Sequence, residues 1–276
     1  MTPQDFEFVS VMLRRRSGLV LTPDKTYLLT SRLTPLTRKF SLAGTDQVVA
    51  ALKRGDRAVE DAVVEAMTTN ETYFFRDPQV FDQFKAAILP ELFKARATTK
   101  RLRVWSAASS SGQEAYSIAL LLKEEFGKMP GWTSTILGTD ISDEMIDRCK
   151  NATYTHFEIQ RGLPVKYLIT SFEDLKGSWR LKPDIRAMVQ FRKWNLLDDF
   201  GTLGQFDIVF CRNVLIYFDT PMKAKILTGI ARIMPDDGVL YLGGAEGVLG
   251  VTEAFKPIPN VRGAYRPNRA GLKPGT

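Results

Sequence analysis

A run of small residues from Ala107 to Gly112 is the first feature of this sequence that could hold a cofactor. It follows a short apolar run around Val104 and precedes apolar residues that recur at helical spacing from Ala115 to Leu122. A strand that ends in a tight loop at a helix N-terminus forms a cofactor-sized crevice at the carboxyl edge of a sheet. Small residues also suit an ordinary strand-to-helix turn, so this stretch alone leaves both interpretations open.

An acidic side chain ends the next expected strand, which runs from Ser134 to Asp140. In nucleotide-binding α/β folds, an acid at the end of the second strand accepts hydrogen bonds from ribose hydroxyls. Asp140 or Ser142 could also serve as the N-cap of the helix expected to follow. The two roles are compatible, so the pattern predicts a binding role without excluding the capping role.

A further group of polar and aromatic side chains lies in the segment TTNETYFFRDP, residues 68–78. Arg76 directly follows two phenylalanines, which predicts a semi-buried setting for its cation. Apolar residues at helical spacing from Val80 to Leu92 predict an amphipathic helix that leads from this segment into the opening strand.

Hydrophobic periodicity divides the chain into three parts. Residues 1–67 show helical spacing and no strand signal, which predicts a small helical subdomain, with Pro35 kinking or breaking its second helix. Residues 68–99 are expected to form a linker and a helix that leads to the sheet. Residues 100–276 alternate strands with helices, which predicts an α/β domain with a mainly parallel, doubly wound sheet.

Residues 151–187 interrupt this alternation. They predict a small β insertion near 155–187, with a short hairpin around residues 176–180. Near the end of the chain, residues 255–258 and 263–266 indicate a final antiparallel pair of strands, and residues 269–276 are expected to be disordered.

Composition is that of a globular protein, because 44% of the 276 residues are hydrophobic and 25% are charged. The longest apolar runs are too short to span a bilayer, and the first residues lack the pattern of a secretory signal. Cys149 and Cys211 are isolated, which predicts neither a disulfide framework nor a metal site and fits a reducing cytoplasm. His156 is the only histidine, which argues against a histidine-dependent catalytic triad or a histidine-rich metal site.

Positive charge is concentrated near the N-terminus. The formal net charge is +7, and residues 1–60 hold ten Lys or Arg against six Asp or Glu, a difference of +4. Such a balance permits nucleic acid, an anionic membrane or an acidic protein as partner. It favours an acidic partner at the N-terminal end, although a solvated helical surface gives the same pattern.

Four segments resemble, in order, the bacterial chemotaxis receptor methyltransferases of the CheR family: TTNETYFFRDP at 68–78, WSAASSSGQEAYS at 105–117, GTDIS at 138–142 and FDIVFCRNVLIYF at 206–218. One departure is Ala115, where the family usually has proline. Since proline in a first helical turn is favourable but dispensable, little should be lost. The resemblance implies a class I methyltransferase (Rossmann-like) α/β sheet, an N-terminal all-helical subdomain and a small inserted β-subdomain.

The resemblance also implies the reaction. The cofactor would be S-adenosylmethionine, the product S-adenosylhomocysteine, and no metal would take part. The protein would be a protein-glutamate O-methyltransferase that forms methyl esters on cytoplasmic helices of chemoreceptors during chemotactic adaptation. It would act in the cytoplasm as a monomer, with no nucleic acid partner and no membrane insertion.

Site residues follow from the same motifs, position by position. Cofactor contacts are expected from Asn70, Thr72, Arg76, Glu114, Asp140, Asn195, Leu196, Arg212 and Asn213. Arg76 and Tyr217 are the catalytic candidates nearest the transferred methyl group, although Tyr217 could also be a core aromatic. Arg32 and Arg38 stand where the family uses basic residues to touch the receptor.

The expected chemistry agrees with the near absence of histidine. A glutamate side chain ordinarily has a pKa of about 4.3, so it is already ionised at neutral pH and needs no general base. The protein would only have to align the carboxylate with the activated methyl group, which is a matter of positioning.

Three alternatives fit this sequence less well. A nicotinamide-dependent dehydrogenase would need G-x-G-x-x-G after the first strand, but the loop has a single glycine, Gly112. A nucleic-acid methyltransferase suits the basic pI, but residues 211–214 read Cys-Arg-Asn-Val where an N-P-P-Y-like motif would stand. A regulatory module that only binds the cofactor is disfavoured by the presence of Arg76, Asp140, Asn213 and Tyr217.

Overall fold

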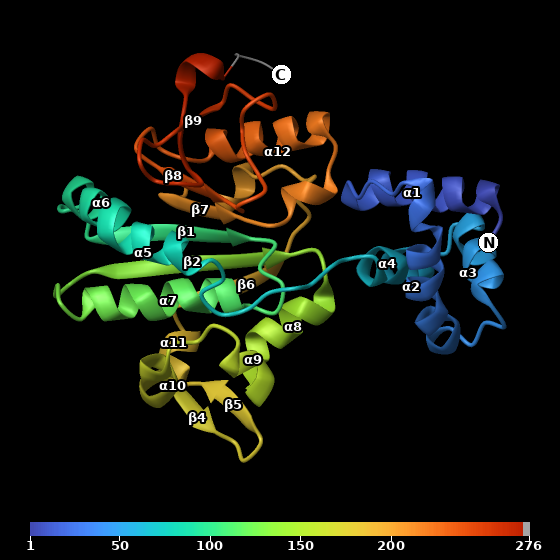
Figure 1. The fold of residues 1–276 in the computed structure, drawn as a ribbon, viewed down its shortest axis with the longest axis horizontal. Helices are drawn as coiled ribbons and strands as arrows, with labels where there is room; N and C mark the ends of the chain where they lie inside the picture. Colours follow the sequence, from blue (N-terminus) through green and yellow to red (C-terminus); the bar gives the residue numbers. More distant parts are fainter. Residues whose placement is uncertain (273–276) are drawn as a thin grey trace. The chain divides into compact units, whose positions relative to one another are not determined.

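The computed structural model describes residues 1–272 and divides into two compact units (Figure 1). Residues Met1–Thr69 together with Tyr217–Met222 form the helical unit. Residues Asn70–Ile216 and the chain from Lys223 onward form the sheet unit. In the described part of the chain, no helix is both long enough and apolar enough to cross a membrane.

Residues 1–69 of the helical unit contain four α-helices and a short 3-10 turn. They are α1 (Pro3–Ser17), η1 (Pro23–Lys25), α2 (Thr26–Lys39), α3 (Thr45–Lys53) and α4 (Arg57–Ala66). A capping box of Thr2 and Asp5 begins α1, and Gly18 in the left-handed conformation ends it. Helix α2 continues through Pro35, so the break expected there does not occur. The buried side chains of Leu33 and Leu36 on either side of Pro35 hold this helix against its neighbours.

The sheet unit is built on seven strands in the order β6-β2-β1-β7-β8-β10-β9 (Figure 1). Their bounds are β1 (Arg101–Ala107), β2 (Thr133–Asp140), β6 (Val189–Lys193), β7 (Ile208–Cys211), β8 (Val239–Leu242), β9 (Phe255–Pro257) and β10 (Ala264–Pro267). The first five strands in the sheet order are parallel, and β10 is antiparallel to both β8 and β9. The predicted doubly wound, mainly parallel sheet with a final antiparallel pair is therefore confirmed.

Both faces of this sheet are covered. On one face, Leu102 and Val104 of β1 join a core with α7 (Gln113–Phe126) and a helical run that precedes the sheet. That run consists of α5 (Pro78–Gln83), the π-helical turn η2 (Phe84–Ile88) and α6 (Leu89–Ala95). On the other face, Trp105 packs against Phe200 and Phe206, with ring centroids 5.0 and 5.6 Å apart. Helix α12 (Thr220–Arg232) lies on this second face, because a side chain at Gly229 would touch Phe200.

An insertion follows α8 (Asp143–Asn151) and precedes β6. It contains a three-stranded antiparallel sheet in the order β3-β5-β4 and three short helices. Their bounds are β3 (Thr153–Thr155), α9 (His156–Gln160), α10 (Val165–Ser171), β4 (Phe172–Asp174), β5 (Ser178–Leu181) and α11 (Pro183–Arg186). The expected hairpin is present, and Lys176 and Gly177 at its turn both have positive φ. The three helices had no clear signal in the sequence, since each has seven residues or fewer.

The end of the described chain is ordered further than expected. Arg269–Gly271 form the 3-10 turn η5, and the Arg269 guanidinium donates a hydrogen bond to the Ala231 carbonyl at 3.1 Å. The disorder predicted for residues 269–276 is thus wrong for this turn. Residues 273–276 lie outside the described residues.

Candidate active site

The small-residue loop after β1 contains three residues at positive φ and is tightly packed at Gly112. Ala108, Ser110 and Gly112 have φ values of 58°, 49° and 96°. A Cβ atom at Gly112 would lie 3.1 Å from the Cys149 sulfur and 3.3 Å from the ring or hydroxyl of two tyrosines. The backbone is fixed from outside as well, since Ser109 N donates to the Thr139 carbonyl at 2.8 Å. The loop is therefore a rigid turn that places the first turn of α7 at the sheet edge.

Asp140 ends β2 beside this loop, as the sequence predicted. Its Oδ2 accepts a hydrogen bond from Ser110 N at 2.8 Å, and its Oδ1 accepts one from Ser142 N at 3.0 Å. The helix cap is Ser142, whose hydroxyl accepts from Met145 N at 3.1 Å. The structure thus assigns the capping role to Ser142, and the Asp140 carboxylate instead ties together the loops after β1 and β2.

Two further candidates lie next to Asp140. The Trp194 amide donates to the Asp140 carbonyl at 2.8 Å, which brings the segment after β6 to the same edge of the sheet. Asn195 and Leu196 follow directly. The Asn195 side chain accepts a hydrogen bond from Leu197 N at 3.1 Å, and Leu196 is buried.

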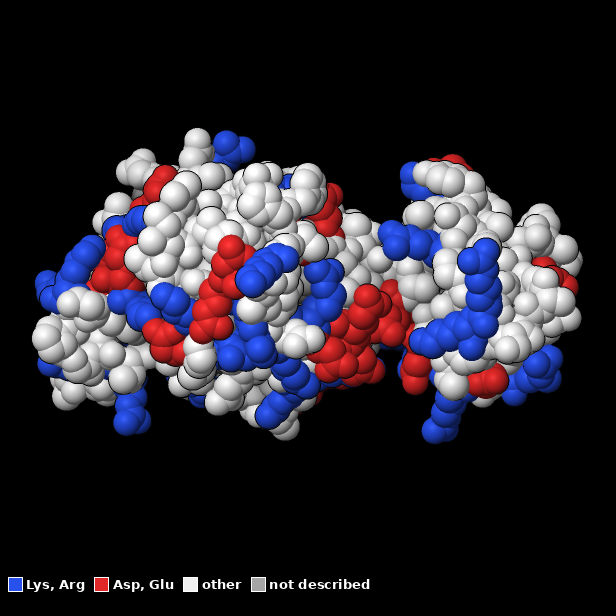
Figure 2. Space-filling model, turned by 90° about the horizontal axis from the view of Figure 1, so that it is seen from below, with Lys and Arg blue, Asp and Glu red and all other residues white. Residues whose placement is uncertain are grey.

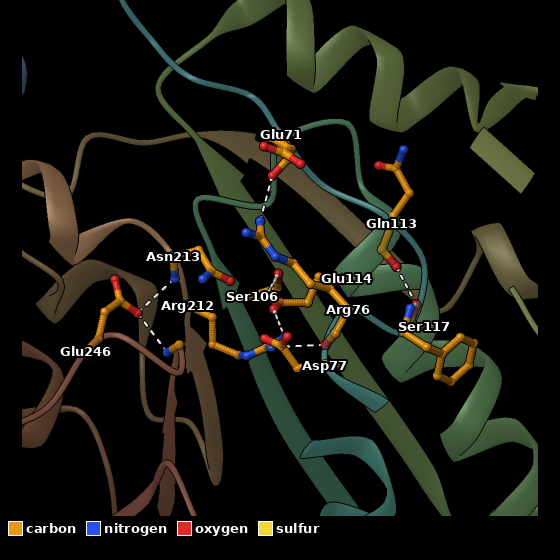
Figure 3. Close-up of polar contacts among 12 residues, drawn as sticks. Glu71, Arg76, Asp77, Ser106, Gln113, Glu114, Ser117, Arg212, Asn213 and Glu246 are labelled. Atoms are coloured by element: carbon orange, nitrogen blue, oxygen red, sulfur yellow. Dashed lines mark hydrogen bonds and ion pairs between the residues drawn. The ribbon is translucent and has the colours of Figure 1, made fainter. Parts of the chain in front are cut away.

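A buried ionic network joins the ends of β1 and β7 (Figure 3). The Arg212 side chain has no exposed surface, and its Nη1 lies 3.0 Å from Glu114 Oε2. Its Nη2 donates to Asp77 Oδ2 at 2.6 Å and to the Arg76 carbonyl at 2.9 Å. The other oxygen of Glu114 accepts from the Ser106 hydroxyl at 2.8 Å. Arg212 therefore fixes the backbone that carries Arg76.

The Arg76 side chain is half-buried and is held by neighbouring groups of its own segment. Its Nη1 donates to the Glu71 carbonyl at 2.8 Å, and its guanidinium lies 5.6 Å from the centre of the Tyr73 ring. Arg161 of the insertion lies 4.5 Å from the same ring and pairs with Glu71 Oε1 at 2.6 Å. The hydrogen bond from Arg161, with the charges of Arg161 and Arg76, holds the pKa of Glu71 below its usual range.

The remaining candidates are placed as follows. The Asn70 carbonyl accepts a hydrogen bond from the Ser110 hydroxyl at 2.8 Å, and Thr72 is half-buried in the same segment.

Tyr217 ends the 3-10 turn η4 (Leu215–Tyr217) and belongs to the helical unit, where its carbonyl accepts from Val20 N at 3.1 Å. Arg32 and Arg38 are on α2 of the helical unit. Among residues 1–272, neither of these two arginines has a described ion pair.

Sequence reasoning missed several groups at this edge, and Glu246 has the most contacts among them. Glu246 lies in the loop after β8 and accepts hydrogen bonds from Asn213 N at 2.8 Å and Gly243 N at 2.7 Å (Figure 3). The available signal was an acid within the glycine-rich run GGAEG after a buried strand. Asp77, Glu71 and Arg161 were also missed, because their roles depend on contacts between segments far apart in the sequence.

Neither cysteine is a candidate nucleophile. Cys149 and Cys211 are free and fully buried. Burial raises the pKa of the Cys211 thiol, and the nearby carboxylates of Glu246 and Glu114 raise it further. Within the described residues, no group of three or more His, Cys, Asp or Glu side chains could hold a metal ion.

A cavity of about 510 Å³ lies elsewhere, in the helical unit. It is lined by residues of α1 and of the segment from Leu21 to Thr26. None of the residues predicted for cofactor or receptor binding lines this cavity, so it belongs to neither predicted site.

The strand order reverses between β1 and β7, and the polar network described above lies at that point. In doubly wound sheets, the crevice at the carboxyl ends of the strands beside such a reversal is the usual place for a nucleotide cofactor. Fold and site together therefore define a Rossmann-like, cofactor-binding α/β protein.

The comparisons with known proteins name the family. A family model described as "CheR methyltransferase, SAM binding domain" matches residues 70–263, and "CheR methyltransferase, all-alpha domain" matches residues 4–68. The chain belongs to the CheR methyltransferase family. It is an enzyme of the S-adenosylmethionine-dependent methyltransferase class, as predicted, which excludes the dehydrogenase alternative.

Three curated relatives agree over nearly the whole chain. The chemotaxis protein methyltransferase of Vibrio parahaemolyticus is 40% identical over 259 residues, which cover 92% of this chain and 93% of that protein. Chemotaxis protein methyltransferase 1 of Pseudomonas aeruginosa is 39% identical, with 92% and 94% covered. The chemotaxis protein methyltransferase of Escherichia coli K12 is 32% identical, with 91% and 86% covered.

The groups at the sheet edge fit S-adenosylmethionine chemically. Carboxylate and amide groups of Asp140 and Asn195 suit the hydroxyl and amino groups of adenosine, and Leu196 adds apolar surface. The methionine end carries an ammonium and a carboxylate, which suit Glu114 and the guanidinium groups. One donor is also unused, since the buried Nε of Arg212 has no hydrogen-bond partner among the described residues.

Proposed function

We propose that this protein transfers the methyl group of S-adenosylmethionine to glutamate side chains on cytoplasmic helices of chemoreceptors, giving methyl esters for chemotactic adaptation. The observation that carries this proposal is the Arg212 network, which fixes the Arg76 backbone at the strand-order reversal. The curated relatives bear the name chemotaxis protein methyltransferase, which supports the same class of substrate.

We assign cofactor binding to residues of the 68–78 segment and of the sheet edge. These are Asn70, Thr72, Arg76, Glu114, Asp140, Asn195, Leu196, Arg212 and Asn213. S-adenosylmethionine supplies a methyl group activated by its sulfonium sulfur. The rigid loop after β1 and the Asp140 carboxylate give the protein a preformed edge for it, so little ordering is needed on binding.

Arg76 is the residue we assign to the incoming glutamate. The substrate carboxylate is already ionised at neutral pH, because its pKa is about 4.3, so no general base is required. A guanidinium can hold a carboxylate with two parallel hydrogen bonds and thereby fix its orientation. Positioning of reactants can lower a barrier by several kcal/mol, up to roughly 7–11 in ideal cases. The role of Tyr217 near the methyl group stays a prediction from its motif.

Receptor docking is assigned to α2. Several arginines of α1 are neutralised within the helical unit, since Arg14 pairs with Asp219 at 2.5 Å and Arg16 with Asp61 at 2.5 Å. Arg32 and Arg38 have no such partner among residues 1–272. Figure 2 shows Lys and Arg side chains together with Asp and Glu on the displayed faces of both units. An acidic partner for α2 is therefore supported by the absence of a described ion pair at Arg32 and Arg38.

Residues 1–67 would then serve receptor docking, residues 68–99 would carry Arg76 and lead to the sheet, and residues 100–276 would bind the cofactor. We further propose that the protein acts in the cytoplasm as a monomer and has no nucleic acid partner. The absence of an N-P-P-Y-like motif at residues 211–214 supports the last point.

The decisive experiment measures base-labile methyl incorporation into purified receptor fragments, with RNA as a parallel acceptor. We expect labelled glutamyl ester on the receptor fragment and none on RNA. Label on RNA alone would overturn the proposal. Binding of S-adenosylhomocysteine without transfer to either acceptor would indicate a regulatory module instead.

Two variants separate the roles. Arg76→Ala should lose most ester formation, and undiminished transfer with intact cofactor binding would remove its assignment. Charge reversal of both Arg32 and Arg38 to Glu should weaken receptor methylation while the affinity for S-adenosylhomocysteine stays unchanged. Equal loss of both properties would point to misfolding.

A further inference from the structure

Glu246 accepts an unusual number of backbone hydrogen bonds. Its Oε1 accepts from Val214 N at 2.9 Å, Leu215 N at 2.7 Å and Ile216 N at 3.3 Å. Its Oε2 accepts from Asn213 N at 2.8 Å and Gly243 N at 2.7 Å. Five N–H groups from two separate loops therefore converge on one carboxylate.

This arrangement suits a carboxylate at position 246. A carboxylate has two oxygens with about four lone-pair sites and no hydrogen, so it can face N–H donors on every side. Among residues 1–272, no lysine or arginine forms an ion pair with Glu246, so the backbone dipoles are its described partners. Space is also restricted, because a Cβ atom at Gly243 would lie 2.7 Å from Glu246 Oε2.

The loop held in this way is the one that follows Arg212. Asn213 has a φ of 59°, the left-handed region that asparagine tolerates better than most residues. A turn of this kind leaves several consecutive N–H groups pointing to one side, where they need an acceptor. Glu246 supplies that acceptor and so stabilises the direction in which the chain leaves β7.

We propose that Glu246 is a positioning residue for methyl transfer, which acts by locking the loop after β7 to the loop after β8. Asp140 has a comparable role on the β1 side of the strand-order reversal, because its carboxylate ties the loops after β1 and β2 together. The geometry of Arg212 and Asn213 then depends on an acid 33 residues away. This inference rests on the proposed function, since it concerns the same site.

The test uses two variants of the full chain and one control. Glu246→Gln keeps the size of the side chain but turns one acceptor oxygen into a donor that faces N–H groups. Glu246→Asp keeps both acceptor oxygens with a shorter reach. Glu253→Gln is the control, because Glu253 is exposed and has no side-chain hydrogen bond described within residues 1–272. Calorimetry with S-adenosylhomocysteine, receptor methylation kinetics and amide hydrogen exchange are measured for each.

We expect the glutamine variant to bind S-adenosylhomocysteine about tenfold more weakly, as loss of hydrogen bonds to a charged group would give. Its kcat, expressed per calorimetrically counted binding site, should fall as well, whereas its KM for the receptor fragment should stay within about twofold. Counting the sites removes the effect of general destabilisation, which would lower only the apparent kcat through loss of folded protein. Exchange of the amides of Asn213 and Gly243 should become faster. The aspartate variant should recover part of each loss, and the control should match the wild type.

Wild-type affinity and kcat in Glu246→Gln would overturn the inference. If that variant does not fold, Glu246→Asp decides: weaker cofactor binding with an unchanged receptor KM supports the inference, and any other outcome refutes it. Failure of the proposed function is seen separately, since the wild type would then form no glutamyl ester while the calorimetric comparison could still be made.

Discussion

The buried guanidinium of Arg212 and the partly buried carboxylate of Glu114 form an ion pair, with Nη1 and Oε2 3.0 Å apart. Glu114 lies in the first turn of α7, after β1, whereas Arg212 directly follows β7. The pair thus bridges the two strands between which the sheet order reverses. Because Arg212 also holds the Arg76 carbonyl, it links the edge proposed for the cofactor to the segment that carries the candidate catalytic arginine.

The first prediction removes this bridge. Glu114→Ala should lower the free energy of unfolding by about 3 kcal/mol, because it leaves a buried charge with one partner fewer. It should also weaken S-adenosylhomocysteine binding. Urea denaturation and calorimetry measure the two effects. Glu173→Ala is a control at an exposed position of β4, where a change within about 0.5 kcal/mol is expected. Equal effects at both positions would contradict the prediction.

The second prediction concerns the small-residue loop. Gly112→Ala should destabilise the protein by about 1–2 kcal/mol from its left-handed backbone alone, and the contact with the Cys149 sulfur adds to this. The loop must then shift, so the affinity for S-adenosylhomocysteine should fall too. Gly250→Ala is the matched control, since Gly250 has a φ of 71° but nothing within 4 Å of its added Cβ. It should lose stability with no change in affinity. Unchanged affinity in Gly112→Ala would show that the loop does not shape the cofactor site.

The residues that the sequence predicted well belong to local patterns. The strand, small loop and helix from Arg101 to Phe126 and the acid that ends β2 were readable because each pattern spans fewer than 30 residues. Alternation of strands and helices was enough to predict a doubly wound sheet. The cofactor and the reaction were predicted from the family resemblance, because hydrophobic periodicity carries no information about either.

The features that were missed depend on contacts between distant segments. Glu246 is 33 residues from Asn213, and Arg161 is 90 residues from Glu71, so no local pattern pairs them. Of the two outcomes expected at Pro35, a kink or a break, the break does not occur, because the packing of α2 overrides that local preference. The short helices of the insertion lack the length at which helical periodicity becomes visible.

A third prediction follows from the acid that holds the insertion to α7. Glu124 accepts hydrogen bonds from Lys166 at 2.6 Å, Tyr167 at 2.6 Å and Lys85 at 3.0 Å. The bonds from Lys166, Tyr167 and Lys85 lower the pKa of Glu124 from 4.5 to about 2. Since its pKa is lowered on folding, its stabilising effect is complete above the unfolded value of 4.5 and is lost as the pH falls toward about 2.

We therefore compare wild type and Glu124→Gln by urea denaturation at several pH values. The variant should be less stable by about 2 kcal/mol near neutral pH, a figure reduced for partial solvent screening. The difference should shrink to less than half by about pH 3, where the wild-type carboxylate begins to protonate. A difference that does not depend on pH would show that the ionised form of Glu124 is not what stabilises this contact.

The last prediction concerns Tyr73, whose ring lies near two guanidinium groups. Arg161 of the insertion is 4.5 Å from its centre, and Arg76 is 5.6 Å from it. Arg161 also pairs with Glu71, whose carbonyl accepts a hydrogen bond from Arg76. The backbone next to Arg161 also lies against the segment that carries Tyr73. A Cβ atom at Gly162 would lie 2.1 Å from the carbonyl oxygen of the residue after Tyr73. The insertion therefore supports the segment that presents Arg76.

Arg161→Ala should lower kcat for receptor methylation by about tenfold, because small displacements of a positioning group are costly in rate. Affinity for S-adenosylhomocysteine should fall less than kcat, because Arg76 is only one of the residues assigned to the cofactor and the contacts of Asp140 and Glu114 stay intact. Arg161→Lys should recover only part of kcat, because lysine keeps the charge but lacks the planar fork. Arg148→Ala is the matched control: it removes an ion pair of the same 2.6 Å length, to Glu158, away from this segment. Wild-type kcat in Arg161→Ala would show that Arg76 is held without the insertion.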